Sequence, residues 1–236
     1  MFAPSSKDRL TEYDLGRFPG DSLFDRIGRT LCPARCLPRK ELYEAWEVAR
    51  RTRRRLRGGR VIDAGGGHGL LAHLMLLLDD TSPQALVVDP GSPPSATRVQ
   101  EAISRQWPRL ADRVSIVAAT IDEFPIESGD VIVSCHACGA LTDRVLARAA
   151  GARARVAVLP CCHDVETCEV GPYSGWVDPA LAIDIGRAAK LDGDGYSVWT
   201  QTIPSAITPK NRLLIASPRE RVTEARTPDE ALPGAQ

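Results

Sequence analysis

Short apolar runs that alternate with helical segments constrain the fold of this 236-residue chain more than any other feature. Five of the runs predict strands, at the start of "RVIDAGGGHG" (60–69) and at residues 85–90, 113–121, 130–135 and 155–160. Helical patterns occupy most of the sequence around them, at residues 39–56, from Leu70 onward, and at residues 95–110 and 141–152. Nearly continuous apolar strands separated by helices indicate a parallel sheet that is covered on both faces.

Two further apolar runs, residues 195–204 and 211–218, have only a short proline-containing loop between them. They predict an antiparallel hairpin at one edge of the sheet. The expected fold is therefore α/β, a doubly wound, seven-stranded and mostly parallel sheet with an antiparallel edge hairpin. We divide the chain into an N-terminal segment (1–38), a domain (39–218) that opens on the helix of residues 39–56, and a polar tail (219–236) that we expect to be disordered.

Charge and hydropathy exclude few classes of function. The chain has 30 basic and 30 acidic side chains, so its net charge argues neither for nor against an anionic partner. No apolar stretch has the length of a membrane span or of a signal peptide. We expect a cytoplasmic protein with no membrane association and no obligate protein partner. Because thiols stay reduced there, its seven cysteines predict burial, catalysis or metal binding rather than disulfides.

The run "RVIDAGGGHG" combines a strand, an acid and a glycine-rich turn that leads into a helix. Glycines let a backbone approach a ligand closely, and a helix N-terminus offers free N–H groups. Asp89 ends the next strand, where a carboxylate can bind the hydroxyls of a ribose. The pattern predicts a nucleotide-type cofactor. The segment from Gly67 to Ala72 also fits the GxGxxA dinucleotide pattern, in a register that begins two residues late.

The register "DAGGGHG" resembles the D/E-x-G-x-G-x-G motif of class I S-adenosylmethionine-dependent methyltransferases, which have a Rossmann-like fold. The final hairpin also resembles the seven-stranded sheet of that family and is foreign to the dinucleotide fold. The resemblance implies S-adenosylmethionine as the cofactor. It assigns the amino group of the cofactor to Asp63, the ribose to Asp89, the adenine to Ile121 and Asp122, and the methionine half to Gly65, Gly67 and Gly69.

Cysteine and histidine cluster after two of the predicted strands, in "VSCHACGALTD" (133–143) and "VLPCCHDVETC" (158–168). In the strand order of the methyltransferases these two strand ends are neighbours on the substrate side of the cofactor. Three interpretations stay open for the cluster: packing, catalysis, or a metal site. The candidate ligands for a metal are Cys138, Cys161, Cys162 and His163. We expect no metal, and we favour His136 for proton transfer at the acceptor, with His163 as a second candidate base.

The motifs "HACGALTD" and "PCCH" also resemble a methyltransferase subfamily that includes tRNA 2′-O-methyltransferases. Asp143 lies within the first motif and is a candidate catalytic residue, although with Thr142 it also suits the capping of the following helix. Lys210 and Asn211 are ordinary turn residues unless their loop folds over the site.

Seven arginines lie between residues 50 and 60. They predict either a solvated helix end or a patch that contacts phosphates. From the resemblance we expect an S-adenosylmethionine-dependent methyltransferase with an unidentified acceptor, for which we favour RNA. The alternatives are an NAD-linked oxidoreductase and a non-catalytic nucleotide- or metal-binding module.

Overall fold

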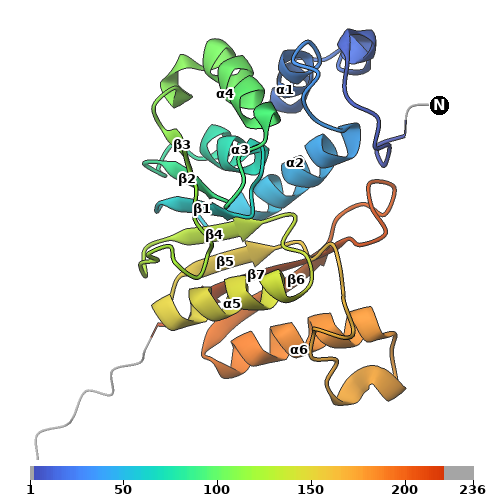
Figure 1. Cartoon of the computed structure of the whole chain (residues 1–236), viewed down its shortest axis with the longest axis vertical. Helices are drawn as coiled ribbons and strands as arrows, with labels where there is room; N and C mark the ends of the chain where they lie inside the picture. Colours follow the sequence, from blue (N-terminus) through green and yellow to red (C-terminus); the bar gives the residue numbers. More distant parts are fainter. Residues whose placement is uncertain (1–2, 221–236) are drawn as a thin grey trace, which may run out of the picture.

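One seven-stranded sheet organises the protein, and the computed structural model describes residues 3–220 (Figure 1). The strands are β1 (Val61–Ala64), β2 (Ala85–Val88), β3 (Val114–Val117), β4 (Val131–Ser134), β5 (Arg155–Val158), β6 (Tyr196–Thr202) and β7 (Arg212–Pro218). Their order is β3-β2-β1-β4-β5-β7-β6. Neighbours among β1 to β5 are parallel, and β7 runs antiparallel to both β5 and β6. The predicted fold, including the antiparallel edge hairpin, is confirmed.

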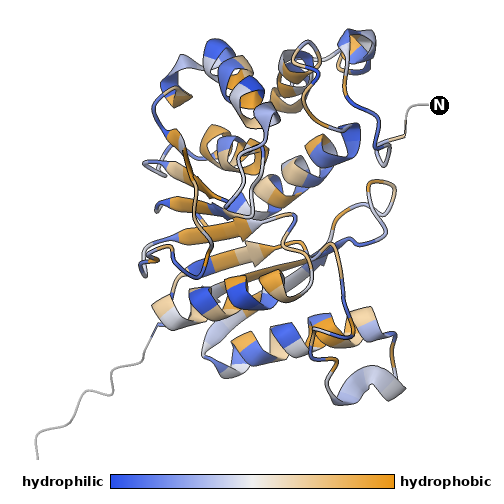
Figure 2. Ribbon diagram, viewed as in Figure 1, coloured by the Kyte–Doolittle hydropathy of each residue, from blue (hydrophilic) through white to orange (hydrophobic). Residues whose placement is uncertain are grey.

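Helices cover both faces of the sheet, so its strands are hydrophobic on both sides (Figure 2). The α-helices are α1 (Leu23–Leu31), α2 (Arg39–Arg53), α3 (Leu70–Leu78), α4 (Pro94–Gln106), α5 (Ala140–Ala152) and α6 (Pro179–Gly193). Three short 3-10 helices accompany them, η1 (Glu12–Arg17), η2 (Pro108–Leu110) and η3 (Pro172–Gly175). Helices α1 to α4 share one apolar core with the sheet, and α5 and α6 share a second core on the opposite face. Within the described residues, no helix has both the length and the apolar character needed to span a membrane.

The N-terminal segment packs against the same core as the sheet. Leu10, Phe18 and Leu31 are fully buried among side chains of α2, α3 and α4. The backbone N–H of Leu10 donates to the carbonyl of Leu37 at 3.1 Å, which closes the segment onto the start of α2. Residues 221–236, which make up most of the tail expected to be disordered, lie outside the described residues.

The third strand is shorter than the predicted range of residues 113–121, because β3 ends at Val117. The Glu123 carboxylate accepts hydrogen bonds from both the backbone N–H and the hydroxyl of Thr120, at 3.1 and 2.8 Å. This side chain stabilises a tight turn, which competes with extension of the strand. Residues 161–194, for which the sequence patterns predicted no element, contain α6.

The predicted capping of α5 by Thr142 and Asp143 is wrong. The helix begins at Ala140 with Gly139 as its N-cap, one turn earlier than a Thr142 cap requires, and no side chain caps it. The Thr142 hydroxyl instead donates to the carbonyl of Ala137, and Asp143 binds an arginine of α6. The glycine is needed because its φ is +55°.

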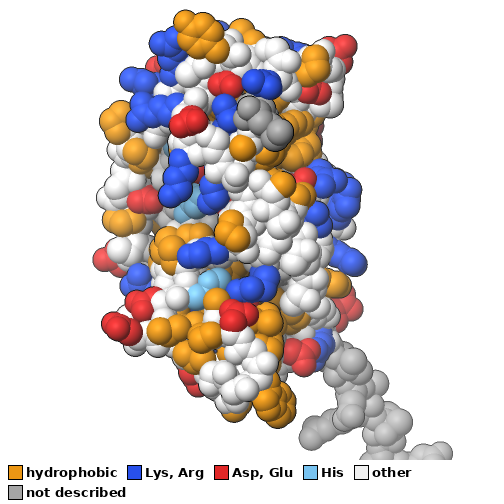
Figure 3. Space-filling model, turned by 90° about the vertical axis from the view of Figure 1, so that its right-hand side faces the viewer, with side chains coloured by type: hydrophobic (Ala, Val, Ile, Leu, Met, Phe, Trp, Pro, Cys, Tyr) orange, Lys and Arg blue, Asp and Glu red, His pale blue; other side chains and the backbone are white. Residues whose placement is uncertain are grey.

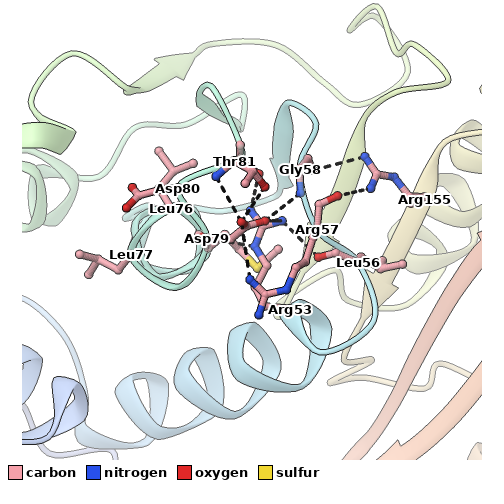
Figure 4. A network of polar contacts seen from close by, with 12 residues as sticks. Arg53, Leu56, Arg57, Gly58, Leu76, Leu77, Asp79, Asp80, Thr81 and Arg155 are labelled. Carbon is pink, nitrogen blue, oxygen red and sulfur yellow. Dashed lines mark hydrogen bonds and ion pairs between the residues drawn. The ribbon is translucent and has the colours of Figure 1, made fainter.

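Most side chains of the arginine run have partners. Arg53 and Arg57 lie at the amino ends of the strands, where both pair with Asp79 (Figure 4). The Arg53 side chain is only 2% exposed and forms an ion pair with Asp79 at 3.2 Å. It also donates to the carbonyls of Met75 and Leu56 and to the hydroxyl of Ser82. The expectation of a solvated face is wrong for Arg53, which joins α2 to the end of α3.

Candidate functional site

Three glycines with positive φ form the turn between β1 and α3. The φ angles of Gly65, Gly67 and Gly69 are +64°, +51° and +73°, a region that glycine adopts without strain. A Cβ atom at Gly69 would lie 2.9 Å from a methyl group of Val87, so packing against β2 explains this glycine. A Cβ atom at Gly67 would meet nothing within 4 Å. Gly67 therefore borders open space at the carboxyl end of the sheet.

Asp89 follows β2 and lies directly against the glycine turn. Its carboxylate accepts hydrogen bonds from the backbone N–H of Gly67 at 3.0 Å and from that of Gly91 at 2.8 Å. The two bonds fix the orientation of the carboxylate and leave it beside the open space in front of Gly67. The structure thus brings together two residues that the sequence analysis assigned to one ligand.

Asp63 supports the glycine turn from beneath. Its side chain is 1% exposed and accepts a hydrogen bond from the backbone N–H of Ala72 in the first turn of α3, at 3.1 Å. A Cβ atom at Gly66 would lie 2.6 to 2.9 Å from the Asp63 carboxyl group, so the turn rests on this side chain. Burial raises the pKa of Asp63 to about 7, against the lowering effect of the Ala72 hydrogen bond.

Ile121 and Asp122 lie beyond the carboxyl end of β3. The Ile121 side chain is buried in the core that also contains Ala64 and Val88, the last residues of β1 and β2. The Asp122 carboxylate is partly exposed and pairs with Arg144 of α5 at 3.1 Å. Both residues are therefore on the same edge of the sheet as the glycine turn.

His68 joins the glycine turn to α2, a contact that sequence reasoning missed. Its Nδ1 accepts a hydrogen bond from the backbone N–H of Leu70 at 3.2 Å, so the ring proton is on Nε2 and donates to Glu41 at 2.6 Å. Burial acts to raise the pKa of Glu41, but the hydrogen bond from His68 contributes to an overall lowering. No local pattern identifies Glu41, because its partner lies 27 residues away.

His136 lies in the loop between β4 and α5 and is half-buried. Burial lowers its pKa, against the opposing effect of Glu41 and Glu44, so the imidazole is neutral at pH 7. Within residues 3–220 its side chain has no hydrogen-bond partner. Its ring nitrogens are therefore available to a bound molecule.

The two cysteine clusters meet, as the sequence analysis expected, because β4 and β5 are parallel neighbours. The Sγ atom of Cys138 lies 2.8 Å from that of Cys161, which lies 3.8 Å from that of Cys162. A hydrogen bond with Cys138 lowers the pKa of Cys162 against the effect of burial, and the charges of Lys210 and Lys40 lower it further. Burial raises the pKa of Cys161.

Lys210 belongs to the loop between β6 and β7, at residues 203–211. Its charge acts to lower the pKa of Cys138 and Cys162, so Lys210 lies near enough to these thiols to act on them electrostatically. In Figure 3, several Lys and Arg side chains lie near histidine side chains on the face that bears the carboxyl ends of the strands, together with Asp and Glu side chains.

His163 and Asp143 take part in a network of ion pairs and hydrogen bonds with α6. His163 Nε2 lies 2.8 Å from both oxygens of the Asp184 carboxylate. Arg187 donates two hydrogen bonds to Asp143, at 2.7 and 2.9 Å, and one to Asp184 at 3.2 Å. Arg212 of β7 donates to Asp184 at 2.6 Å. Sequence reasoning missed Asp184 and Arg187, since it predicted no helix for their segment.

The largest of the described pockets lies elsewhere, between α6 and the edge hairpin. It encloses about 790 Å³ and is lined mainly by apolar side chains, among them Leu181, Ile185 and Leu214. None of the residues assigned to the cofactor lines it. The candidate site is therefore identified by its side chains and its glycine turn, and not by the size of this pocket.

Solved structures of methyltransferases are similar to this chain at low identity. One is the mitomycin 7-O-methyltransferase MmcR, at 20% identity over 89% of this chain and 63% of that chain, with a TM-score of 0.49. Another is the S-adenosylmethionine-dependent methyltransferase SibL, at 18% identity over 90% of this chain and 66% of that chain, with a TM-score of 0.49. A third is ribosomal protein L11 methylase from Lactobacillus delbrueckii subsp. bulgaricus, at 12% identity over 75% of this chain and 77% of that chain, with a TM-score of 0.48. The chain spans less than two thirds of the length of MmcR and SibL.

Comparison with family models gives a firmer assignment. No curated protein matches the chain. A family model described as a methyltransferase domain matches residues 40–167, more than half of the sequence. The match runs from α2 through the glycine turn to the second cysteine cluster. The chain therefore belongs to this methyltransferase domain family.

Proposed function

We propose that the protein transfers a methyl group from S-adenosylmethionine to an acceptor. The observation that carries the proposal is the hydrogen bond from the backbone N–H of Gly67 to the Asp89 carboxylate. The space in front of Gly67 is open, since a Cβ atom built there would meet nothing within 4 Å. A turn without side chains next to an oriented carboxylate suits a ligand with a ribose. The residues present therefore fit the cofactor, and the family match favours methyl transfer over the NAD-linked alternative.

Each cofactor residue has a role that its environment supports. Asp89 accepts hydrogen bonds from the ribose hydroxyls, and its orientation is already fixed by Gly67 and Gly91. Ile121 offers an apolar surface to the adenine, with Asp122 at its polar edge. Asp63 supports the turn through its hydrogen bond from Ala72, and its carboxyl group lies below the amino group of the cofactor. The bound cofactor supplies an electrophilic methyl group on a positively charged sulfur.

His136 accepts the proton that the acceptor loses. Its lowered pKa keeps the imidazole neutral, and its lack of a protein partner leaves a nitrogen free for the acceptor. His163 and Asp143 act as positioning residues. Asp184 and Arg187 bind them, and these contacts hold the loops after β4 and β5 against α6. The chain thus orients the acceptor and removes one proton, while nearby apolar strands limit access of water.

We favour RNA as the acceptor because basic side chains lie near the candidate site. Lys210 and Lys40 lie near enough to Cys162 to lower its pKa, and further Lys and Arg side chains lie on the same face in Figure 3. Such side chains attract the phosphates of a nucleic acid. The arginine run contributes less to this argument, since its side chains are largely paired.

Methyl transfer is tested by incubating the protein with S-adenosylmethionine that carries a labelled methyl group. RNA, protein and small-molecule fractions of a cell extract serve as acceptors, and mass spectrometry identifies the labelled product. We expect label in RNA, and its loss with His136→Asn. Label in the protein or small-molecule fraction would replace RNA as the acceptor. Absence of transfer to every fraction, with no binding of the cofactor, would overturn the proposal.

A further inference from the structure

Three thiols from two loops converge beside the glycine turn. Cys138 comes from the loop after β4, and Cys161 and Cys162 follow β5. All three are free, and their sulfur atoms all lie within 4.8 Å of one another. We propose that Cys138, Cys161 and Cys162 bind a thiophilic divalent metal ion, for which Zn²⁺ is the probe. The proposal replaces our expectation of no metal, and it stands independently of methyl transfer.

The distances between the sulfurs suit a zinc ion. Tetrahedral geometry with Zn–S bonds of about 2.3 Å separates two sulfur ligands by about 3.8 Å. The Cys161 and Cys162 sulfurs are 3.8 Å apart, and the Cys138 and Cys161 sulfurs are 2.8 Å apart. A displacement of the Cys138 sulfur by about 1 Å brings its distance from the Cys161 sulfur to this value, and the Cys138 and Cys162 sulfurs already lie within 4.8 Å of each other. Because Cys138 is exposed, its side chain has room for this movement.

The backbone holds the two loops together without a metal. Ser134 and Val158, the last residues of β4 and β5, are direct partners in the sheet. The backbone N–H of Gly139 then donates to the carbonyl of Cys162 at 3.1 Å. The ligands are thus carried on loops that the sheet and this hydrogen bond position in advance. Such preorganisation lowers the entropic cost of metal binding.

The described residues supply three ligands and leave the fourth position open. His163 is bound to Asp184 and does not belong to the group of converging side chains. A tetrahedral ion held by three side chains keeps one position for water or substrate, the arrangement typical of catalytic zinc sites. The metal would therefore be accessible at the carboxyl end of the sheet, where Gly67 borders open space.

Metal content and thiol reactivity test the site directly. Reduced full-length protein is loaded with Zn²⁺, freed of excess metal, and analysed for zinc and for alkylatable cysteines before and after a chelator. We expect one zinc per chain and three additional reactive thiols after chelation. Co²⁺ in place of Zn²⁺ should give a thiolate-to-cobalt charge-transfer absorption. None of these readouts depends on methyl transfer, so failure of the metal site and failure of the proposed function are distinguished.

Serine variants locate the ligands. Cys162→Ser and Cys138→Ser should each weaken zinc binding by more than about 100-fold, since even loss of a residue that only supports a ligand costs about 10- to 100-fold. The control Cys36→Ser removes a thiol of the N-terminal segment and should leave zinc affinity unchanged. Circular dichroism verifies the folding of each variant, and Cys138→Ser, at an exposed position, is the one expected to fold without difficulty. The proposal is overturned if the reduced wild-type protein binds no stoichiometric zinc, or if both variants bind zinc as the wild-type protein does. It is also overturned if oxidation forms a Cys138–Cys161 disulfide and the protein, once reduced again, still takes up no zinc.

Discussion

The two ends of the sheet differ in how completely their polar groups are paired. At the amino ends, Arg53 and Arg60 bind carboxylates and carbonyls, and Arg155 donates to the carbonyls of Arg57 and Gly58 (Figure 4). At the carboxyl ends, His136 has no hydrogen-bond partner among the described residues, and Gly67 borders open space. Paired groups stabilise a fold, whereas unpaired groups in a fixed geometry are available to a ligand. We therefore assign stabilisation of the fold mainly to the amino ends of the strands, and ligand binding and catalysis to their carboxyl ends.

The largest expected effect is on stability and comes from the amino end. Arg53→Met leaves the Asp79 carboxylate without its buried partner. Removal of one member of a buried ion pair costs about 3–5 kcal/mol. Urea unfolding measures this loss. Arg57→Met is the matched control, since Arg57 is exposed and pairs with the same carboxylate at 3.7 Å, and it should cost less than about 1 kcal/mol. Equal losses for the two variants would contradict the division of roles.

Gly67→Val should have the next largest effect, on cofactor binding. The branched side chain enters the space that borders the turn, and φ of +51° strains any residue with a Cβ atom. We expect the Kd for S-adenosylhomocysteine to rise by more than about 100-fold, or about 2.7 kcal/mol. Calorimetry measures the binding, with Gly129→Val as control at an exposed glycine near the amino ends. Unchanged affinity in Gly67→Val would remove the turn from the site.

Sequence patterns predicted the fold well because burial determines it. Strands β1, β2, β4 and β5 are almost entirely buried, and the Gly-rich turn lies where a strand leads into a helix. The turn at Thr120 and Glu123 was missed, since a local side-chain contact outcompeted an apolar run. Glu41 and Asp184 were missed for a different reason. Their roles arise from contacts between distant segments, with His68 and with His163, and no spacing along the chain encodes these contacts.

His136→Asn should reduce turnover without weakening cofactor binding. Loss of a positioned base typically lowers kcat by about 10²- to 10⁴-fold. The Kd for S-adenosylhomocysteine should stay within about twofold of wild type, because among the described residues no hydrogen bond joins His136 to the glycine turn, and Asn is also uncharged. Steady-state kinetics and calorimetry give the two values. A variant that keeps its kcat would exclude His136 as the base.

Asp63 gives a pH dependence of stability. Its pKa is raised from 3.8 to about 7 on folding. The contribution of the protonated Asp63 to the free energy of unfolding is therefore fully present below pH 3.8 and is lost as the pH rises through about 7. Between these two pH values the free energy of unfolding of the wild-type protein, relative to Asp63→Asn, should fall by about 1.4 kcal/mol per pH unit. Urea unfolding at pH 5, 6 and 7 tests this slope. A difference that does not change with pH would mean that Asp63 is ionised in the folded protein throughout.

The smallest effect is expected from three residues of the arginine run. Replacement of Arg51, Arg54 and Arg55 with glutamine should leave RNA affinity within about twofold, because Arg51 already pairs with Glu47 and Gln201, and Arg54 and Arg55 lie beside β6 at the far edge of the sheet. Lys210→Gln should weaken RNA binding and reduce its salt dependence, since Lys210 acts electrostatically on Cys162. Fluorescence anisotropy at several salt concentrations compares the two variants. A larger loss from the arginine variant would place the RNA surface beside β6.

Calorimetric titration of the wild-type protein with S-adenosylhomocysteine, and separately with NAD, tests the central claim that the carboxyl end of the sheet holds the methyl-donor cofactor. We predict saturable binding of one S-adenosylhomocysteine per chain, weakened about 10-fold or more by Asp89→Ala through loss of a charge-assisted hydrogen bond to the ribose. NAD should give no comparable binding. Tighter binding of NAD, or S-adenosylhomocysteine binding that Asp89→Ala leaves unchanged, would contradict the account.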